Sequence, residues 1–400
     1  MPSFSFFPTL PHTLNLLAAT GLILIVGILC ARLVTRFLAI PAITGYVLAG
    51  LLIGPAGLNL IGTADLNDFS LLIHLALGIV VFELGRRLDY RWLLHEKWLL
   101  VTAIAMSVSI FFGLFTLLIE LGIGKLVASM AAAIGIATSP AVILSVVRES
   151  KAEGQVSERM LNIVAISNSL AFIVFTMCLS ALHVEYRNDW ISFVLHPLYL
   201  MLGSIVLGWA ASRLLICFSQ WLGRDMQSQR IALFALLAAT VGLAAMLKLS
   251  ALIALLVFGI ASRNDDHRHA VVEPDFSQFS GLLYALLFIY AGAKLELVHL
   301  RDLWAVALAF IATRLAISLF FATALSPLNG LSARKGVLLG VGLVPMSGVA
   351  IILMERATEI YPEFGPQLTA LMLSVLAILE LLGPICTRLA LVASGEAKHY

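Results

Sequence analysis

The sequence predicts an all-α integral membrane protein of about 13 transmembrane helices, built as an inverted repeat with two crossing discontinuous helices. Three observations lead to this prediction: the composition, the spacing of long apolar runs, and a proline-interrupted helix in each half of the chain. Of the 400 residues, 61% are hydrophobic and 12% are charged. In soluble domains about a quarter of the residues are charged, and no soluble domain could bury so much apolar surface.

The apolar runs have the length that a membrane-crossing helix requires, about 20 residues. They predict helices over 13–38, 42–54, 68–86, 97–120, 125–147, 158–183, 191–217, 228–247, 249–262, 277–294, 302–324, 334–355 and 365–390. We therefore expect one transmembrane domain over 1–392. The remainder, 393–400, is expected to be a short cytoplasmic tail, with no regulatory nucleotide-binding domain.

The positions of lysine and arginine predict the orientation. With the N-terminus outside, 18 basic residues fall in cytoplasmic segments and six in outer segments, as the positive-inside rule requires. The first apolar run follows a segment without Lys or Arg, so we interpret it as a spanning helix and not as a cleaved signal peptide. We expect a multi-pass protein of a bacterial-type inner membrane, surrounded by lipid, with a cytoplasmic C-terminus.

Charge, cysteines and motifs exclude several classes of protein. The net charge of +2 gives no indication of a nucleic-acid partner. The four cysteines lie within or beside apolar runs without a CxxC spacing, so neither disulfides nor a zinc site is expected. Because no nucleotide loop, nucleophile elbow or metal-ligand motif occurs, we expect neither an enzyme nor a cofactor nor a metal site. The histidines of RNDDHRH, His267 and His269, fit a solvated turn.

A proline interrupts the predicted helix 125–147, which contains the segment GIATSPAVIL with Pro140. The helix 334–355 contains GLVPMSGVAIIL, with Pro345, Ser347 and Gly348 near its middle. Because proline lacks the N–H that continues a helix, each helix is expected to be broken at this point. The alternative is that each proline only kinks a continuous helix.

The two interruptions are predicted at 137–141 and 344–348, in helices that run in opposite directions through the membrane. This arrangement is typical of an inverted repeat whose broken helices cross near the midplane. Unwound backbone there exposes N–H and C=O groups, and the half-helix ends carry partial charges. Such a place suits an ion-binding site.

Arg314 lies near the middle of the predicted helix 302–324, roughly 15–18 Å from either end at about 1.5 Å per residue. Its side chain cannot reach the membrane surface from there. We therefore expect it to face the interior of the bundle and to meet carbonyl oxygens, a carboxylate or an anion. One alternative is that it only neutralises the C-terminal ends of the broken helices.

A proton-coupled cation carrier needs a titratable group within the membrane. The helix 158–183 contains Asn168 and Ser169 but no acid at this depth, and neither side chain titrates. Glu83 and Glu380 are the acids that lie well inside apolar runs, so they are the candidate proton carriers. Glu83 could instead pair with Arg86 or Arg87 on its own helix, and Glu380 could be a packing partner of another polar group.

Several segments together resemble the cation:proton antiporter superfamily, nearest its Kef/Nap-type branch. They are IPAITGYVLAGLLIGPAGLNLI (40–61), ATSPAVILSVVRE (137–149), the basic Arg314, GLVPMSGVAIILMERA (342–357) and ELLGPICTRLAL (380–391). The resemblance implies a thirteen-helix fold, a homodimer and elevator-like alternating access. It also implies a mobile core, about 97–183 and 302–390, and a panel that forms the dimer from the rest.

The resemblance also implies site residues. Thr138, Ser139 and Pro140 match the first crossover segment. Pro345, Ser347 and Gly348 match the second, and Arg314 matches the basic residue beside the ion site.

The sequence departs from this family at the pair Asn168–Ser169, where electrogenic relatives have two acids and many electroneutral ones have Asn–Asp. The end of the third predicted helix, ELGRRLD, also departs from the GLEL-like pattern. We expect a monovalent cation (Na⁺ or K⁺):proton antiporter in which another acid carries the proton. Two alternatives remain: a transporter of the same fold for a small anion, and a non-transporting or channel-like member.

Overall fold

A computed structural model describes residues 16–38, 40–58, 60, 63–88, 96–187, 190–223, 225–266, 271, 277–295, 297–346 and 348–397. Every regular element among these residues is an α-helix, which confirms the predicted class. The elements are α1 (Leu16–Leu38), α2 (Ala42–Ile53), α3 (Thr63–Arg87), α5 (Lys97–Glu120), α6 (Lys125–Gly135), α7 (Pro140–Glu149), α8 (Gln155–Arg187), α9 (Trp190–Leu222), α10 (Met226–Met246), α11 (Ala251–Asn264), α12 (Ser277–Ala293), α13 (Leu297–Ala324), α14 (Ala333–Gly342), α15 (Gly348–Ile360) and α16 (Gly365–Ala393).

The order of these helices follows the predicted order, and the largest shifts lie at helix ends. Predicted helix 68–86 begins earlier, at Thr63, and predicted helix 191–217 extends to Leu222. Among the described residues, eight spans are long and apolar enough to cross a membrane, and three further apolar helices are shorter. The count of thirteen crossings therefore stays a prediction.

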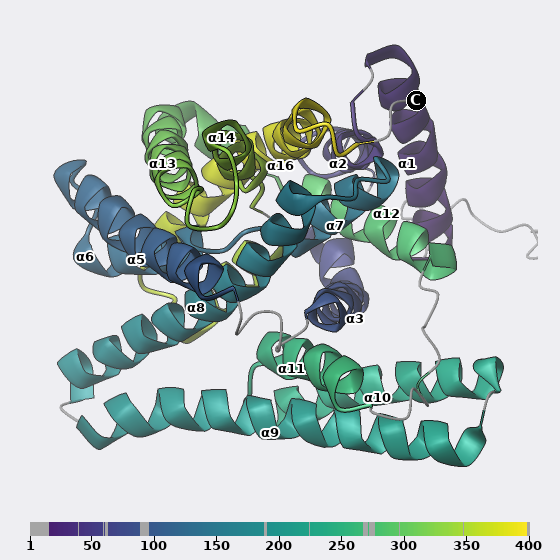
Figure 1. Ribbon diagram of the computed structural model, residues 1–400. Coiled ribbons are helices and arrows are strands. Elements are labelled where there is room, and N and C mark those ends of the chain that lie inside the picture. The colour runs from purple at the N-terminus through teal and green to yellow at the C-terminus, as the bar shows by residue number, and fades with distance from the viewer. Residues whose placement is uncertain are drawn as a thin grey trace, which may run out of the picture.

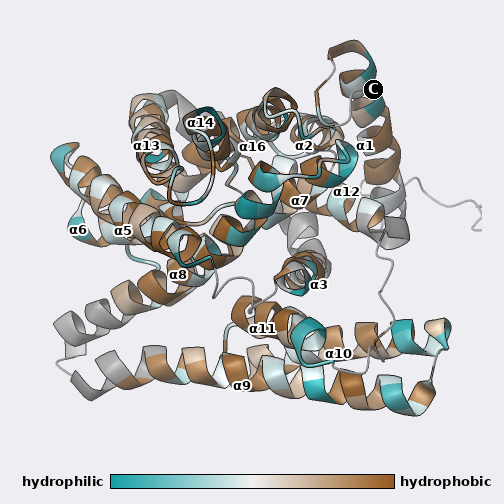
Figure 2. Ribbon diagram, viewed as in Figure 1, coloured by the Kyte–Doolittle hydropathy of each residue, from teal (hydrophilic) through white to brown (hydrophobic). Residues whose placement is uncertain are grey.

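Large apolar side chains cover the outward faces of the peripheral helices. Phe112 on α5 is 59% exposed, and Val206 on α9 is 62% exposed. Figure 2 shows hydrophobic residues running along both of these helices. Water does not tolerate such faces at this density, whereas lipid tails do.

The helices pack as two sets. The first, which we name the core set, contains α5–α8 and α13–α16, in which α13 packs on α5, α14 and α16. The second, the panel set, contains α1–α3 and α9–α12, in which α11 packs on α3 and α9, and α12 packs on α2. In Figure 1, α9, α10 and α11 lie together on one side of α3, and α7 lies on the opposite side of α3.

Glycines let α2 and α12 approach until their backbones touch. A Cβ atom added at Gly50 would lie 1.9 Å from the carbonyl oxygen of Ile289, and one added at Gly292 would lie 2.1 Å from that of Val47. Between helices in lipid, where no hydrophobic effect drives association, such close packing supplies the attraction. The GYVLAGLLIG pattern therefore determines how α2 sits against α12.

Replacing Gly50 by alanine should destabilise the protein by about 1–3 kcal/mol, because the new methyl group overlaps the α12 backbone. The matched control is Gly242→Ala in α10, where an added Cβ meets no atom within 4 Å. The control should leave stability unchanged or raise it, because alanine favours helix. The comparison is the thermal unfolding midpoint of the three proteins in detergent; equal midpoints for both variants would contradict the packing argument.

Candidate functional site

The first broken helix consists of α6 and α7, separated by residues 136–139, which lie outside both helices. Ser139 is the N-cap of α7, and its Oγ accepts a hydrogen bond from the Val142 N–H at 3.2 Å. Pro140 is the first residue of α7, where its missing N–H does no harm. The break is thus confirmed, but it begins one residue and ends two residues earlier than predicted, because Pro140 opens the second half-helix and does not belong to the unwound segment.

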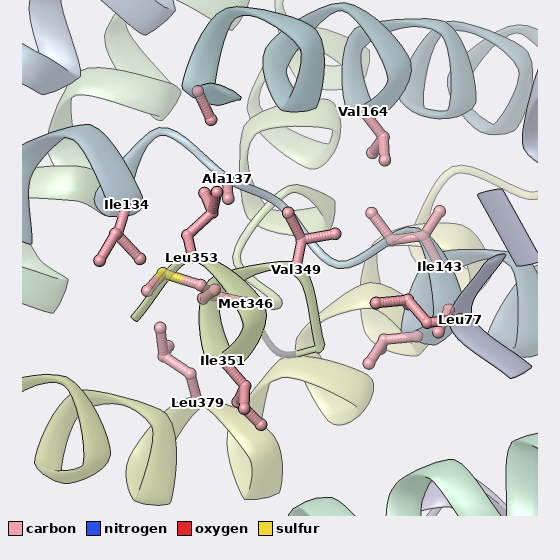
Figure 3. Packing of buried hydrophobic residues seen from close by; sticks show 14 of the residues in the cluster. Leu77, Ile134, Ala137, Ile143, Val164, Met346, Val349, Ile351, Leu353 and Leu379 are labelled. Atoms are coloured by element: carbon pink, nitrogen blue, oxygen red, sulfur yellow. The ribbon is translucent and has the colours of Figure 1, made fainter. Parts of the chain in front are cut away.

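The second broken helix consists of α14 and α15, with Pro345 between them. The two breaks touch directly: the Ser139 N–H donates a hydrogen bond to the Pro345 carbonyl oxygen at 2.9 Å. Figure 3 shows Ala137 of the first break near Met346 of the second, with Val349 of α15 beside them. The predicted crossing is confirmed. Ser347 lies outside the described residues, so its predicted role stays a prediction.

Arg314 on α13 joins both breaks. Its side chain is 3% exposed, and its guanidinium donates five hydrogen bonds. The acceptors are the carbonyl oxygens of Gly135 (2.8 Å), Ala137 (3.0 Å), Val344 (2.7 Å) and Leu343 (3.3 Å) and the Thr138 hydroxyl (3.1 Å). The expected interior position is confirmed.

These acceptors belong to the last residue of α6 and to residues that directly follow α6 and α14, next to helix ends where carbonyls have no partner within the helix. Both ends carry partial negative charge, so the cation compensates two helix dipoles at once. The guanidinium of Arg314 therefore donates mainly to backbone carbonyl oxygens. A role in binding the transported ion stays a prediction.

Asn168 and Ser169 lie on α8 beside the first break. The Asn168 amide group donates to the carbonyl oxygens of Thr138 and Val164, both at 2.8 Å, and the Ser169 hydroxyl donates to Ala165 at 3.0 Å. The Asn168 Oδ1 is buried and accepts no hydrogen bond from the described residues. A flipped amide would point its oxygen at two carbonyl oxygens, so the orientation is determined by the network. This oxygen is therefore an available acceptor.

A small cavity of about 20 Å³ lies at this point, lined by Asn168, Ser169, Pro140, Val349 and apolar side chains of α3, α8 and α11. This volume admits about one water-sized particle. Pro140 and Val349 are the first and second residues of α7 and α15. The positively polarised N-termini of both half-helices therefore reach the cavity.

A larger cavity of about 430 Å³ adjoins the small one, since Phe172 and Leu252 line both. Its walls are mostly apolar, and its charged lining residues are Lys248, Glu355 and Arg356. Lys248 and Arg356 are exposed, so the cavity reaches the protein surface. We name this cavity the vestibule.

Glu83 is buried on α3 and pairs with Arg148 of α7. The sequence suggested Arg86 or Arg87 as its partner, because these lie one turn away on the same helix. The partner from another helix was missed, because no local spacing connects residues 65 positions apart. Glu83 therefore joins the panel set to the core set.

Glu380 is 1% exposed on α16. Gly383 and Thr387, three and seven residues further, lie on the same helix face. Both touch the second break: the Thr387 hydroxyl donates to the Gly342 carbonyl oxygen at 3.0 Å, and a Cβ at Gly383 would lie 2.9 Å from the Pro345 Cα. The acid is thus placed on the face of α16 that packs on the crossover. Thr387 was not among the predicted site residues, because a threonine in an apolar helix carries no signal of its contact.

Among the described residues, no group of three His, Cys, Asp or Glu side chains could hold a metal ion. His267 and His269 lie outside those residues.

Replacing Arg314 by methionine should lower stability by about 3–5 kcal/mol, because it leaves several buried carbonyl oxygens without a donor. The stability of Arg314→Lys should lie between that of the unmodified protein and that of Arg314→Met, since lysine keeps the charge but not the planar set of five donors. The control is Arg213→Met on α9, which removes a half-exposed partner of Asp265 and should change stability by less than about 1 kcal/mol. The unfolding midpoint in detergent measures all three; a loss no larger than that of the control would refute this role of Arg314.

Known proteins match the chain over nearly all its length. The model of the family "Sodium/hydrogen exchanger, transmembrane" matches residues 21–392. The iron transporter MagA of Paramagnetospirillum magneticum is 25% identical over 381 residues, which cover 92% of this chain and 84% of that protein. The glutathione-regulated potassium-efflux protein KefC of Salmonella paratyphi B is 26% identical over 380 residues, which cover 90% of this chain but only 59% of that protein.

The fold matches that of the sodium proton antiporter MjNhaP1 from Methanocaldococcus jannaschii at pH 8, with a TM-score of 0.70, 17% identity and coverage of 95% of this chain and 96% of that chain. At this identity, the likeness concerns the fold alone. The family model, in contrast, includes both breaks, Arg314, Asn168 and Ser169 in its match. The chain belongs to the sodium/hydrogen exchanger family of transmembrane proteins.

Proposed function

We propose that the chain is a secondary active transporter that exchanges a monovalent cation, Na⁺ or K⁺, for protons by alternating access. Family membership supports the general class, a cation:proton antiporter. The observation that carries the choice of a cation is the buried Asn168 Oδ1, an acceptor without a donor among the described residues. Oxygen atoms of this kind are the ligands of hard monovalent and divalent cations.

The polar side chains that line the small cavity offer acceptors and not donors. The N–H groups of Asn168 and the hydroxyl hydrogen of Ser169 are used on backbone carbonyls. The guanidinium of Arg314, which an anion would seek, donates to the two helix ends. A dehydrated cation of roughly the size of water therefore fits both the volume and the chemistry of the cavity.

One observation favours the second candidate, a small anion. The N-termini of α7 and α15 both reach the cavity, and no acid stands at 168–169 to balance their partial positive charge. Helix N-termini attract anions. The site favours an anion if the helix dipoles contribute most to the electrostatic potential in the cavity, and a cation if the side-chain oxygens contribute most.

The vestibule supports an access path from one side. It leads past Phe172, one turn beyond Asn168 towards the C-terminal end of α8, and this end is predicted to lie outside. On the other side of the cavity, Leu84 of α3 and the Glu83–Arg148 pair fill the interface between the two sets. The arrangement therefore corresponds to an outward-facing state of an alternating-access transporter.

Glu380 is the acid that we propose as the proton carrier, because it lies on the face of α16 that packs on the second break. A homodimer, a bacterial inner membrane and the predicted orientation complete the proposal, and these follow from the resemblance and from the distribution of charge.

Purified protein in liposomes should acidify or alkalinise the lumen when a Na⁺ or K⁺ gradient is imposed, and a chloride or phosphate gradient should have no effect. Glu380→Gln should abolish proton movement, because the amide cannot titrate. Lumenal pH is followed with a fluorescent dye, and empty liposomes with a proton ionophore serve as the control. Proton movement driven by an anion gradient alone would establish the second candidate.

Asn168→Asp should create or strengthen proton-linked cation exchange, because it adds a titratable carboxyl at the cavity between two positively polarised helix ends. Asn168→Ala should weaken cation-dependent transport by removing the acceptor oxygen. Asn162→Asp, one to two turns earlier on α8 and outside the cavity lining, is the matched control. If both Asn168 variants transport every tested ion as the unmodified protein does, the ion site lies elsewhere.

A further inference from the structure

Among the described residues, two ion pairs connect the core set to the panel set. Glu83 of α3 pairs with Arg148 of α7, and Lys294, the residue after α12, pairs with Glu355 of α15. Lys294 also lies over the ring of Tyr290, with its Nζ 4.9 Å from the ring centroid. In each pair, one charge lies on the second half of a broken helix and the other on a helix of the panel set.

The two pairs lie at opposite ends of α2. At the first residue of α2, the Ala42 N–H donates to the carboxylate of Glu149, which is adjacent to Arg148. At the other end, a Cβ on Gly54 would lie 2.8 Å from the Cα of Ala293, which is adjacent to Lys294. The 12 residues of α2 span roughly 18 Å at about 1.5 Å per residue. The pairs therefore stand on opposite sides of the crossover.

The inverted repeat explains this placement. In the part of the chain that the structure describes, α3 and α12 each precede a broken helix with one helix between them, α5 in the first half and α13 in the second. Arg148 and Glu355 lie at similar depths in their half-helices, eight and seven residues after the first residue. The repeat thus produces two equivalent contacts with opposite polarity: the panel set supplies the acid in one and the base in the other.

Contacts within a set are of a different kind from contacts between the sets. Inside the panel set, glycines bring backbones together: a Cβ at Gly85 would lie 2.4 Å from the Leu256 carbonyl oxygen, and one at Gly259 would lie 2.2 Å from that of Phe82. Among the described glycines, the one that faces the other set, Gly348, meets only the side chain of Leu77, at 3.2 Å. Backbone interlocking holds each set together, whereas side-chain ion pairs join the sets.

We propose that Glu83–Arg148 and Lys294–Glu355 are two symmetry-related latches that hold the core set in the arrangement described, and that both must break when it moves. This inference rests on the alternating access proposed above. The side chains of Arg148, Lys294 and Glu355 are partly exposed, at 29%, 21% and 34%, whereas that of Glu83 is buried, at 8%. The Lys294–Glu355 pair therefore contributes modestly to the equilibrium between conformations, and the Glu83–Arg148 pair, with its buried carboxylate, contributes more. Glu355 also lines the vestibule, so the second latch stands at the wall of the access path.

The test measures movement and not transport. Spin labels on the exposed Glu120 of α5 and Met246 of α10, after replacement of the four native cysteines, report the distance between the sets by double electron–electron resonance in lipid nanodiscs. Glu83→Gln, Arg148→Gln, Lys294→Gln and Glu355→Gln should each raise the population of a second distance by about two- to fivefold. The charge swaps E83R/R148E and K294E/E355K should return the distribution towards that of the unmodified protein.

Asp265→Asn is the matched control, because it removes an ion pair with Arg213 at 3.2 Å that lies wholly inside the panel set. It should leave the distance distribution unchanged. The latch inference would be overturned if all four glutamine variants had the distance distribution of the unmodified protein. It would also be overturned if the charge swaps gave the same distribution as the single variants. If the distances respond but no ion is transported in liposomes, the latches stand and the proposed function falls.

Discussion

Arg314 satisfies the backbone that the two broken helices leave open, and the crossover depends on it. Carbonyl oxygens in the middle of a bilayer find no water, and each unsatisfied group costs several kcal/mol. Five hydrogen bonds from one guanidinium cover the ends of α6 and α14. The direct bond from the Ser139 N–H to the Pro345 carbonyl oxygen joins the two breaks to each other. Unwound backbone is tolerable here because protein groups have replaced the lost helical partners.

The crossover is electrostatically asymmetric. A positive side chain compensates the two negative helix ends, whereas the two positive ends at Pro140 and Val349 face the neutral Asn168 and Ser169. In a site of this size, one formal charge is large compared with a helix end of about half a charge. Under the proposed function, an ion that enters changes this charge balance, and we expect the side chain at position 168 to determine which sign of charge is favoured.

Two kinds of contact occur in this fold: close backbone packing at glycines within each set, and ion pairs between the two sets. The backbone contacts at glycines, as between α2 and α12 or between α3 and α11, are too close to admit a larger side chain, because a single methyl group would overlap a carbonyl oxygen. The ion pairs Glu83–Arg148 and Lys294–Glu355 are made by long side chains that can separate and re-form. A structure that is rigid within each set and adaptable between them is suited to a rigid-body rearrangement.

The sequence by itself determined the class of fold, the order of the helices and the position of both breaks to within two residues. These properties follow from local chemistry: apolar length for a helix in lipid, the missing N–H of proline, and the depth at which an arginine cannot reach water. The depth of Arg314 in its helix also placed its side chain in the interior, whereas the family resemblance, and not local chemistry, placed Asn168 and Ser169 beside the crossover.

Only the tertiary structure decided the partners. The sequence placed Glu83 near Arg86 and Arg87, but folding brings it to Arg148 on another helix. It left open whether Arg314 binds carbonyls or an anion, and it carried no sign of the contact between Thr387 and Gly342. Pairings between residues dozens of positions apart depend on how helices cross, and crossing is set by the summed packing of many small side chains. Local periodicity does not contain that information.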